Sequence, residues 1–385
     1  MDPWTTPERI SLRKMVADFT EKEIVPHLPR WEEDGEVPRR LHEQAAELGL
    51  LELGFPEAAG GAGEFLDVLV VTEEILLRGG SSGLLGALMT HNIGAPHIAA
   101  AGDPDQIDRF VRPALAGRKI CGLGVTEPGM GSDVAALSTR AVRDGDHYIV
   151  NGAKTYITSG TRADFITTAV RTGDAGHRGV SLLIVETSTP GFTVTRKLDK
   201  MGCRCSDTAE LSYVDVRVPV ANLVGGEGTG FRQIMQRFDS ERLIMAVQAC
   251  ATAARCLELS LDWARQRVTF GLPLAQRQVI RHKLAEMARQ TTAARTFVHD
   301  VARRYNDGEQ VSVDIAMAKN TAVYACDHVV NEALQIFGGM GYMRESEVER
   351  HYRDARLLGI GGGANEVMNE IIAKNLNLDT VGSAR

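Results

Sequence analysis

Long apolar runs, paired cysteines and clusters of basic residues are all scarce in this chain of 385 residues. The longest apolar stretches are short or broken by charge, whereas a membrane-spanning helix needs about 20 apolar residues. We therefore expect no membrane span. The first residues, MDPWTTPERI, lack the apolar core of a secretory signal. Acidic and basic residues are interspersed, with a net charge of -7, and the lack of a basic face argues against a nucleic-acid partner.

Cysteine is too rare to form a disulfide framework, with six residues in the whole chain. Cys203 and Cys205 are too close together to make a zinc site alone, and no second Cys/His pair has a suitable spacing. We therefore expect that the thiols are reduced, that the protein is cytoplasmic and that it has no metal site.

The chain does have enough apolar residues, 44%, for a sizeable core, and its length favours roughly two to three domains. Apolar residues recur at helical spacing between Ile10 and Phe19 and again between Phe65 and Leu76. Residues 1–118 are therefore expected to form a helical domain, interrupted by a loop from Gly54 to Gly63. Residues 227–385 are again helical, with long segments near 230–268, 276–307, 311–337 and 364–375, and this succession predicts a helical bundle.

Residues 119–226 are rich in Thr, Val, Ile and Tyr and predict a small antiparallel β domain. The expected strands include His147–Val150, Val180–Glu186 and Leu211–Val218. The turn signals between strands are Asp144-Gly145-Asp146, Asn151-Gly152 and Pro190-Gly191. The expected fold class is α+β multidomain, with an N-terminal helical domain, a middle antiparallel β domain and a C-terminal four-helix bundle.

Two segments of the β region have the composition of ligand-binding elements. The loop from Gly124 to Asp133 is rich in Gly and Pro and carries Thr and Ser hydroxyls, which lets backbone amides approach a polar ring edge or a phosphate. The segment from Lys154 to Gly160 places an aromatic face beside a hydroxyl, which suits contact with a flat ring. The alternatives are an ordinary surface loop and an ordinary half-buried strand.

The segment Gly359–Glu366 superficially fits the dinucleotide-binding pattern G-x-G-x-x-A. It follows a charged helical segment, Arg350–Leu358, and not a strand, so a Rossmann assignment fails. A glycine-rich loop that leads into the N-terminus of a helix remains, and this geometry suits an anionic or carbonyl oxygen.

Glu241 is the candidate catalytic residue. Apolar residues recur at helical steps through Phe231, Ile234, Phe238 and Met245, and Glu241 fills the missing step of this buried stripe. A carboxylate there costs several kcal/mol unless it is paired, protonated or facing a cavity. The alternative is a structural ion pair with a residue such as Arg242 or with a partner helix.

Five motifs in this order resemble those of the acyl-CoA dehydrogenase family, over nearly the whole chain. Thr126-Glu127-Pro128 with Gly131-Ser132-Asp133 looks like the T-E-P-x-x-G-S-D loop of the family, and residues 151–160 look like its N-G-x-K-x-x-I-T-x-G. The segments Arg267-x-x-Phe270-Gly271, Gln335-Ile336-Phe337-Gly338-Gly339-x-Gly341-Tyr342 and Arg350-x-x-Arg353-Asp354-Ala355 resemble three signatures of its C-terminal domain.

The resemblance implies FAD as the cofactor and a role for each matched residue. Residues around the isoalloxazine ring would be Leu123, Gly124, Val125, Thr126, Ser132, Tyr156, Ile157 and Thr158. The ADP half, held across a subunit interface, would contact Arg267, Phe270, Gln278, Gln335, Ile336, Phe337, Gly338 and Gly339. Further cofactor contacts would come from Ala364, Asn365 and Glu366, although Ala364 lacks the hydroxyl usual at its position. The thioester substrate would contact Ser132, Asp239, Arg242, Gly362 and Gly363. The implied assembly is a homotetramer built as a dimer of dimers.

One departure from the family pattern concerns the catalytic base. Many members carry their Glu in a Y-E-G-T segment, where this chain has Gly362. A subset that includes isovaleryl-CoA and long-chain acyl-CoA dehydrogenases instead carries it on the facing helix directly before an Arg, and Glu241-Arg242 looks like that arrangement.

The activity implied is α,β-desaturation of an acyl-CoA of medium, long or branched chain. Glu241 would accept the α-proton, while the Gly362 N–H and a flavin ribityl hydroxyl would stabilise the enolate oxygen. Hydride would pass to flavin N5, and electrons would leave through an electron-transfer flavoprotein. The alternatives are a related flavoenzyme that acts on a carrier-protein thioester or reacts with oxygen, and an inactive helical scaffold. Chain length and branching stay open.

Overall fold

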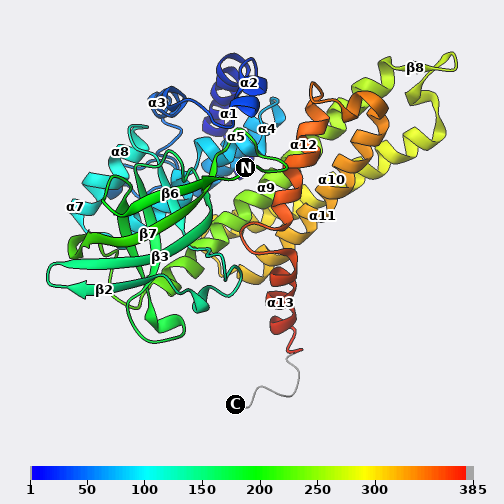
Figure 1. The fold of residues 1–385 in the computed structure, drawn as a ribbon. Helices are drawn as coiled ribbons and strands as arrows, with labels where there is room; N and C mark the ends of the chain where they lie inside the picture. The colour runs from blue at the N-terminus through cyan, green and yellow to red at the C-terminus, as the bar shows by residue number, and fades with distance from the viewer. Residues whose placement is uncertain (1, 379–385) are drawn as a thin grey trace. The chain divides into compact units, whose positions relative to one another are not determined.

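The helical and strand periodicities of the sequence produce separate sets of helices and strands in the computed structural model, which describes residues 2–378 (Figure 1). The chain divides into two units. Within the described residues, the first unit comprises 2–29, 66–82 and 239–378, and the second comprises 30–65 and 83–238. The units cut across the three sequence spans 1–118, 119–226 and 227–385, which remain a prediction.

Long helices dominate the first unit: α9 (Gly230–Gln266, from Asp239 onward), α10 (Gln278–Asn306) and α11 (Ser312–Phe337). They run beside one another in Figure 1. The buried face of α10 repeats every three or four residues through Leu284, Met287, Thr291, Ala294, Val298, Val301 and Ala302. The shorter helices α12 (Glu347–Ala355) and α13 (Asn365–Asn375) pack against α11, and α1 (Pro7–Phe19) and α4 (Phe65–Leu77, from Leu66 onward) also belong to this unit. These bounds confirm the long helical segments predicted for the C-terminal region.

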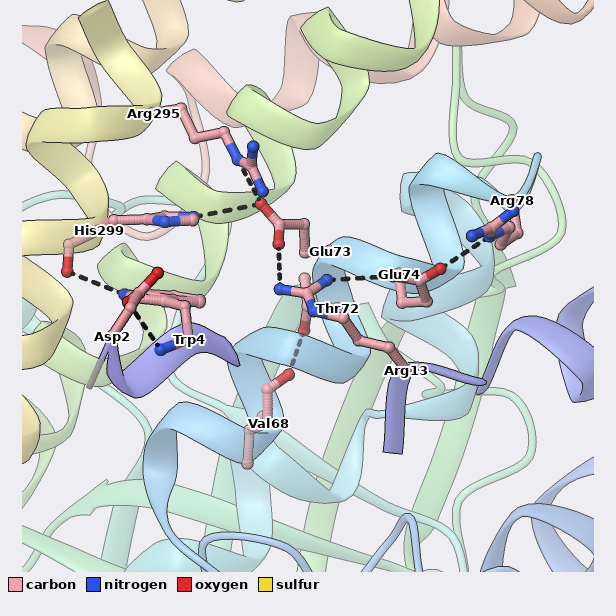
Figure 2. A network of polar contacts seen from close by, with 10 residues as sticks. All are labelled: Asp2, Trp4, Arg13, Val68, Thr72, Glu73, Glu74, Arg78, Arg295 and His299. Carbon is pink, nitrogen blue, oxygen red and sulfur yellow. Dashed lines mark hydrogen bonds and ion pairs between the residues drawn. The ribbon is translucent and has the colours of Figure 1, made fainter. Parts of the chain in front are cut away.

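A buried carboxylate ties the N-terminal helices to α10, as Figure 2 shows. Glu73 of α4 is 1% exposed. Its Oε2 accepts from Arg13 Nη2 at 2.6 Å, and its Oε1 accepts from Arg295 Nε at 2.8 Å and contacts His299 Nε2 at 3.2 Å. Burial alone would raise the pKa of Glu73, but the hydrogen bonds from His299 and Arg295 hold it well below its ordinary value. Trp4 stacks on His299 with ring centroids 3.7 Å apart.

A seven-stranded sheet forms the centre of the second unit, in the order β1-β4-β2-β3-β7-β6 with β5 paired to β4. The strands are β1 (Cys121–Gly124), β2 (Arg140–Asp144), β3 (His147–Thr158), β4 (Phe165–Arg171), β5 (Val180–Glu186), β6 (Phe192–Lys197) and β7 (Thr208–Pro219). Most pairs are antiparallel, as predicted, but β1 and β2 each pair with β4 in parallel. The accompanying helices are α3 (Arg39–Glu47), α5 (Ser82–Leu88), α6 (His91–Ala101), α7 (Pro104–Gln106) and α8 (Arg112–Leu115), while α2 (Leu28–Asp34) straddles the boundary between the units.

Both faces of β4 and β5 are buried, and most of their side chains are apolar. Phe165 of β4 and Leu182 of β5 pack in one core cluster with residues of α6 and α8, including Ile98 and Leu115. The intervening side chains of the same strands pack in a second cluster around Tyr148 and the neighbouring strands. The α+β fold class is therefore confirmed.

One predicted turn is wrong. Asn151-Gly152 does not separate two strands, because β3 continues from His147 to Thr158 and pairs with β7 on both sides of it. The register shifts between Val150 and Gly152, which marks a β-bulge. Gly152 has a φ of 153°, and a Cβ there would lie 2.5 Å from Thr139 Oγ1. The glycine therefore serves a close backbone approach within a strand and not a hairpin turn.

The structure bears on two expectations from composition, those about the cysteines and about a membrane span. All six cysteines are free and buried. By length and hydropathy alone, α9 is the one helix among residues 2–378 that meets the criterion for crossing a membrane, with an 18-residue window of mean hydropathy 1.3. More than half of that window, 56%, is buried inside the protein, as in a core helix.

Candidate active site

A buried ion pair holds the predicted loop from Gly124 to Asp133 in the second unit. Lys154 of β3 is fully buried, and its Nζ donates to Glu127 Oε1 at 2.8 Å and to the carbonyl oxygen of Val125 at 3.0 Å. The Glu127 carboxylate also accepts from the backbone N–H groups of Ser138 and Thr139. Burial alone would raise the pKa of Glu127, but the Lys154 ammonium and these donors lower it to about 2.

The same loop is joined to β3 through its backbone. The N–H of Thr155 donates to the carbonyl of Thr126 at 2.9 Å, so Thr126 lies beside the strand that carries Tyr156 and Thr158. A Cβ added to Gly122 would lie 3.0 Å from the carbonyl oxygen of Thr158. The structure therefore brings together the two segments that the sequence predicts around a flat ring.

The end of β3 has an unusual backbone. The register with β7 shifts again between Lys154 and Ile157, and Tyr156 and Ser159 have left-handed φ angles of 60° and 58°. Such conformations cost about 1–3 kcal/mol and concentrate at functional sites. At this bulge Tyr156 is 70% exposed while Ile157 is buried.

Glu241 of α9 lies in the first unit and has the environment predicted for it. The residue is half-buried, yet its Oε1 atom is buried without a hydrogen-bond partner. Burial raises the pKa of Glu241 to about 8, against a smaller lowering by Arg242. Among the described residues Glu241 forms no ion pair with Arg242, and that guanidinium instead pairs with Asp239, at 3.1 Å from Nη1 to Oδ1.

The α9 segment around Glu241 packs against the glycine-rich loop. Arg242 Nε donates to the carbonyl of Gly362 at 3.2 Å. A Cβ added to Gly362 would lie 2.7 Å from Met245 Sδ, so the Met245 side chain occupies the space next to this glycine. Gly362 and Gly363 have left-handed φ angles of 61° and 96°. The predicted residues Glu241, Arg242, Gly362 and Gly363 are therefore brought together within one unit.

Asp239 is held by two partners. Besides Arg242, Ser312 Oγ donates to its Oδ2 at 2.5 Å. Both carboxylate oxygens of Asp239 are thus engaged, whereas Glu241 keeps a buried oxygen without a partner. Of the two carboxylates, Glu241 is the one that is available to accept a proton.

The predicted ADP-binding residues gather at one end of the α9–α11 bundle. Arg267 follows α9 directly, and its guanidinium lies 5.9 Å from the ring centroid of Trp263, which in turn stacks on Phe337 of α11 at 4.8 Å. The hairpin of β8 (Val268–Thr269) and β9 (Leu272–Pro273) carries Phe270 at its tip, 97% exposed. Gln278 begins α10 beyond this hairpin, Gln335 to Phe337 end α11, and Gly338 and Gly339 follow it directly.

The N-terminus of α13 lies next to the glycine-rich loop. Its N-cap residue, Ala364, has no side chain that could cap the helix, so backbone N–H groups there stay without a side-chain acceptor. Asn320 Nδ2 donates to the carbonyl of Asn365 at 3.0 Å, and Asn365 Oδ1 is buried without a partner. Glu366 is exposed.

Three family models match the chain in order: the acyl-CoA dehydrogenase N-terminal domain over residues 6–118, the middle domain over 122–216 and the C-terminal domain over 228–377. This chain belongs to the acyl-CoA dehydrogenase family. The mitochondrial long-chain specific acyl-CoA dehydrogenase of Mus musculus is 37% identical over 371 residues, which cover 96% of this chain and 86% of the mouse protein.

Solved structures give the same result for this acyl-CoA dehydrogenase. A probable acyl-CoA dehydrogenase from Mycobacterium abscessus has a TM-score of 0.96 and 65% identity, covering 97% of this chain and 100% of that one. A chain in a solved structure of the electron transferring flavoprotein of Acidaminococcus fermentans has a TM-score of 0.92 and 34% identity. The match covers 98% of this chain and 100% of that one. The protein is a flavin-dependent oxidoreductase of acyl-CoA chemistry, with FAD as its cofactor.

The residues of the acyl-CoA dehydrogenase fit this cofactor. Tyr156 exposes a flat aromatic face, and a Cβ on Gly129 or Gly131 would meet nothing within 4 Å, which leaves open space over the loop. In the described part of the chain, the hydroxyls of Thr126 and Thr158 donate no hydrogen bond to another residue. The uncapped N–H groups of α13 suit a phosphate. The residue roles themselves remain predictions from the family motifs.

Sequence reasoning missed three residues that shape these sites. Lys154 and Glu127 were read as parts of motifs and not as a buried pair, and Lys319 of α11 was not singled out. Lys319 is fully buried and donates from Nζ to the carbonyls of Gly361 and Gly363. A charged residue within the apolar and alanine-rich pattern of α11 was the signal that could have identified it.

Proposed function

We propose that this enzyme oxidises an acyl-CoA thioester of medium, long or branched chain between its α and β carbons, with Glu241 as the base. The observation that carries the proposal is the Glu241 carboxylate, with its buried unpartnered oxygen and a pKa raised to about 8 by burial. A general base works best when its pKa lies near the working pH. The absence of a carboxylate at Gly362 leaves this role to α9.

The residues around Glu241 divide the work on the thioester. Glu241 accepts the α-proton, which is weakly acidic and needs a base shielded from water. The Gly362 N–H donates to the thioester oxygen, where negative charge develops as the proton leaves. Asp239 and Arg242 hold the bound thioester in place; they pair with each other, and Arg242 also binds the carbonyl of Gly362. Ser132 contacts the pantetheine arm. When bound, FAD supplies the acceptor for the β-hydrogen and its electron pair.

Electrons are proposed to leave through an electron-transfer flavoprotein. The likeness to a chain solved in work on such a flavoprotein supports this partner. We also propose a homotetramer, because exposed apolar side chains gather around the hairpin and the start of α10: Val268, Phe270, Leu272 and Val279. A second subunit would cover them while its FAD meets Arg267. The six free thiols support a cytoplasmic location.

A substrate panel tests the proposal. Purified holoenzyme is mixed without oxygen with straight and branched acyl-CoAs, and bleaching of the flavin absorbance is followed. Bleaching by at least one acyl-CoA, with turnover by an artificial acceptor faster than by oxygen, is expected for a dehydrogenase. Bleaching only by carrier-protein thioesters would replace CoA in the proposal, and a colourless protein that takes up no FAD would refute it.

A further inference from the structure

We propose that Lys319 is a positioning residue that orients the Gly362 N–H toward the thioester oxygen by binding the carbonyls on both sides of it. This inference rests on the proposed function, since it assigns a role within the same site. The peptide group between Gly361 and Gly362 contains both the carbonyl that Lys319 binds and the N–H that would contact substrate.

The geometry of a peptide group connects these two atoms. A trans peptide is planar, and its C=O and N–H bonds point in opposite directions. Lys319 Nζ donates to the Gly361 oxygen at 2.8 Å, so the direction of the Gly362 N–H is set by this bond. The same Nζ donates to the Gly363 oxygen at 2.5 Å, and Arg242 Nε donates to the Gly362 oxygen at 3.2 Å. Three successive peptide groups are thus held by two cations from α9 and α11.

Such bonds matter most where the backbone would otherwise rotate freely. Gly362 and Gly363 lack Cβ atoms and have left-handed φ angles, so rotation of these peptide groups is sterically cheap. Among the hydrogen bonds of residues 2–378, none is donated by the Gly362 N–H, so no acceptor on the protein fixes it. Its orientation therefore depends on the Lys319 side of the peptide group.

The position of Lys319 is costly to maintain unless it has such a role. The side chain is fully buried, and within residues 2–378 no carboxylate lies at ion-pair distance from it. Burial lowers the pKa of Lys319 to about 8. Its ammonium also polarises the peptide group that it binds, which makes the Gly362 N–H a stronger donor to an oxygen that gains charge.

The test uses FAD-loaded enzyme with Lys319→Met, which keeps the length of the side chain and removes its charge and donors. Acetoacetyl-CoA is the probe, because it ionises at its α-carbon without redox chemistry, and its enolate absorbs in the near ultraviolet. The bound probe is titrated with pH. We expect its apparent pKa to rise by about one unit, equivalent to about tenfold weaker stabilisation of the enolate. We also expect kcat to fall about tenfold or more, since direct loss of an oxyanion donor costs about 10²–10³.

Two further variants separate positioning from stability. Val330→Ala opens a cavity in the core of the same helix, three turns away, and should lower stability without changing the pKa of the bound probe. Lys319→Arg keeps the charge but not the geometry, and should give an intermediate pKa; it also carries the test if Lys319→Met fails to retain flavin. The inference is overturned if the ionisation constant of the bound probe changes by less than about twofold in both Lys319 variants. If the unmodified enzyme bleaches with no acyl-CoA, the proposed function fails instead.

Discussion

Replacing Glu241 by Gln isolates the proton-accepting role of this side chain. Gln has nearly the same shape but accepts no proton at neutral pH, so we expect turnover to fall by about 10²–10⁴-fold or more. FAD content and binding of substrate analogues should stay close to those of the unmodified enzyme. A residual rate above roughly a tenth of the unmodified rate, a smaller loss than a base should give, would show that another group removes the proton.

The pKa of Glu241 adds a second, independent measurement. With a pKa raised to about 8, the carboxylate is mostly protonated at lower pH, so kcat/KM of the unmodified enzyme should rise with pH and level off above about pH 8. The folded state binds more protons than the unfolded chain between pH 4.5 and 8, so stability falls as pH rises through this window. Glu241→Gln removes this dependence and should be at least as stable as the unmodified protein at pH 9. A structural ion pair predicts the reverse, with reduced stability and activity lost only in proportion to folded protein.

The remaining predictions test other parts of the molecule. Arg267→Ala should weaken FAD retention and subunit assembly together, because the guanidinium fork suits the phosphate oxygens of a neighbour's cofactor; a tetramer that keeps its flavin on dilution would contradict this role. Glu241→Gln with Gly362→Glu should recover little activity, since the left-handed backbone and the contact with Met245 oppose a side chain at 362. Adding Met245→Ala should make room and restore part of the rate, and equal rates with and without it would refute the steric reasoning. Glu73→Gln should lower the free energy of unfolding, measured by urea denaturation, by about 2–4 kcal/mol. The value is below the upper range for fully buried pairs because the partners of Glu73 are partly exposed. Because its pKa is lowered in the folded state, the contribution of Glu73 is present above pH 4.5 and lost as the pH falls, so the variant and the unmodified protein should converge in acid.

Much of the fold followed from periodicity. The helical segments predicted near 276–307 and 311–337 correspond to α10 (Gln278–Asn306) and α11 (Ser312–Phe337), because a long amphipathic stripe repeats over many turns. The predicted strand Val180–Glu186 is β5. The burial of Glu241 was also readable, since its step in the stripe of α9 sets the face on which it lies. The order of the family motifs supplied the cofactor and the reaction class.

Tertiary structure alone decided the features that depend on residues far apart in the chain. A dipeptide such as Asn151-Gly152 has the same local preference in a hairpin and in a bulge, and only the pairing of β3 with β7 selected the bulge. Lys154 meets Glu127, Glu73 meets Arg295, and Lys319 meets the carbonyl of Gly361 across 27, 222 and 42 residues of sequence. Periodicity shows which side chains turn inward, but it carries no information about which buried charge meets which partner. That choice depends on how the helices and strands pack, and it determines whether a buried polar group is a structural contact or an unpartnered acid such as Glu241.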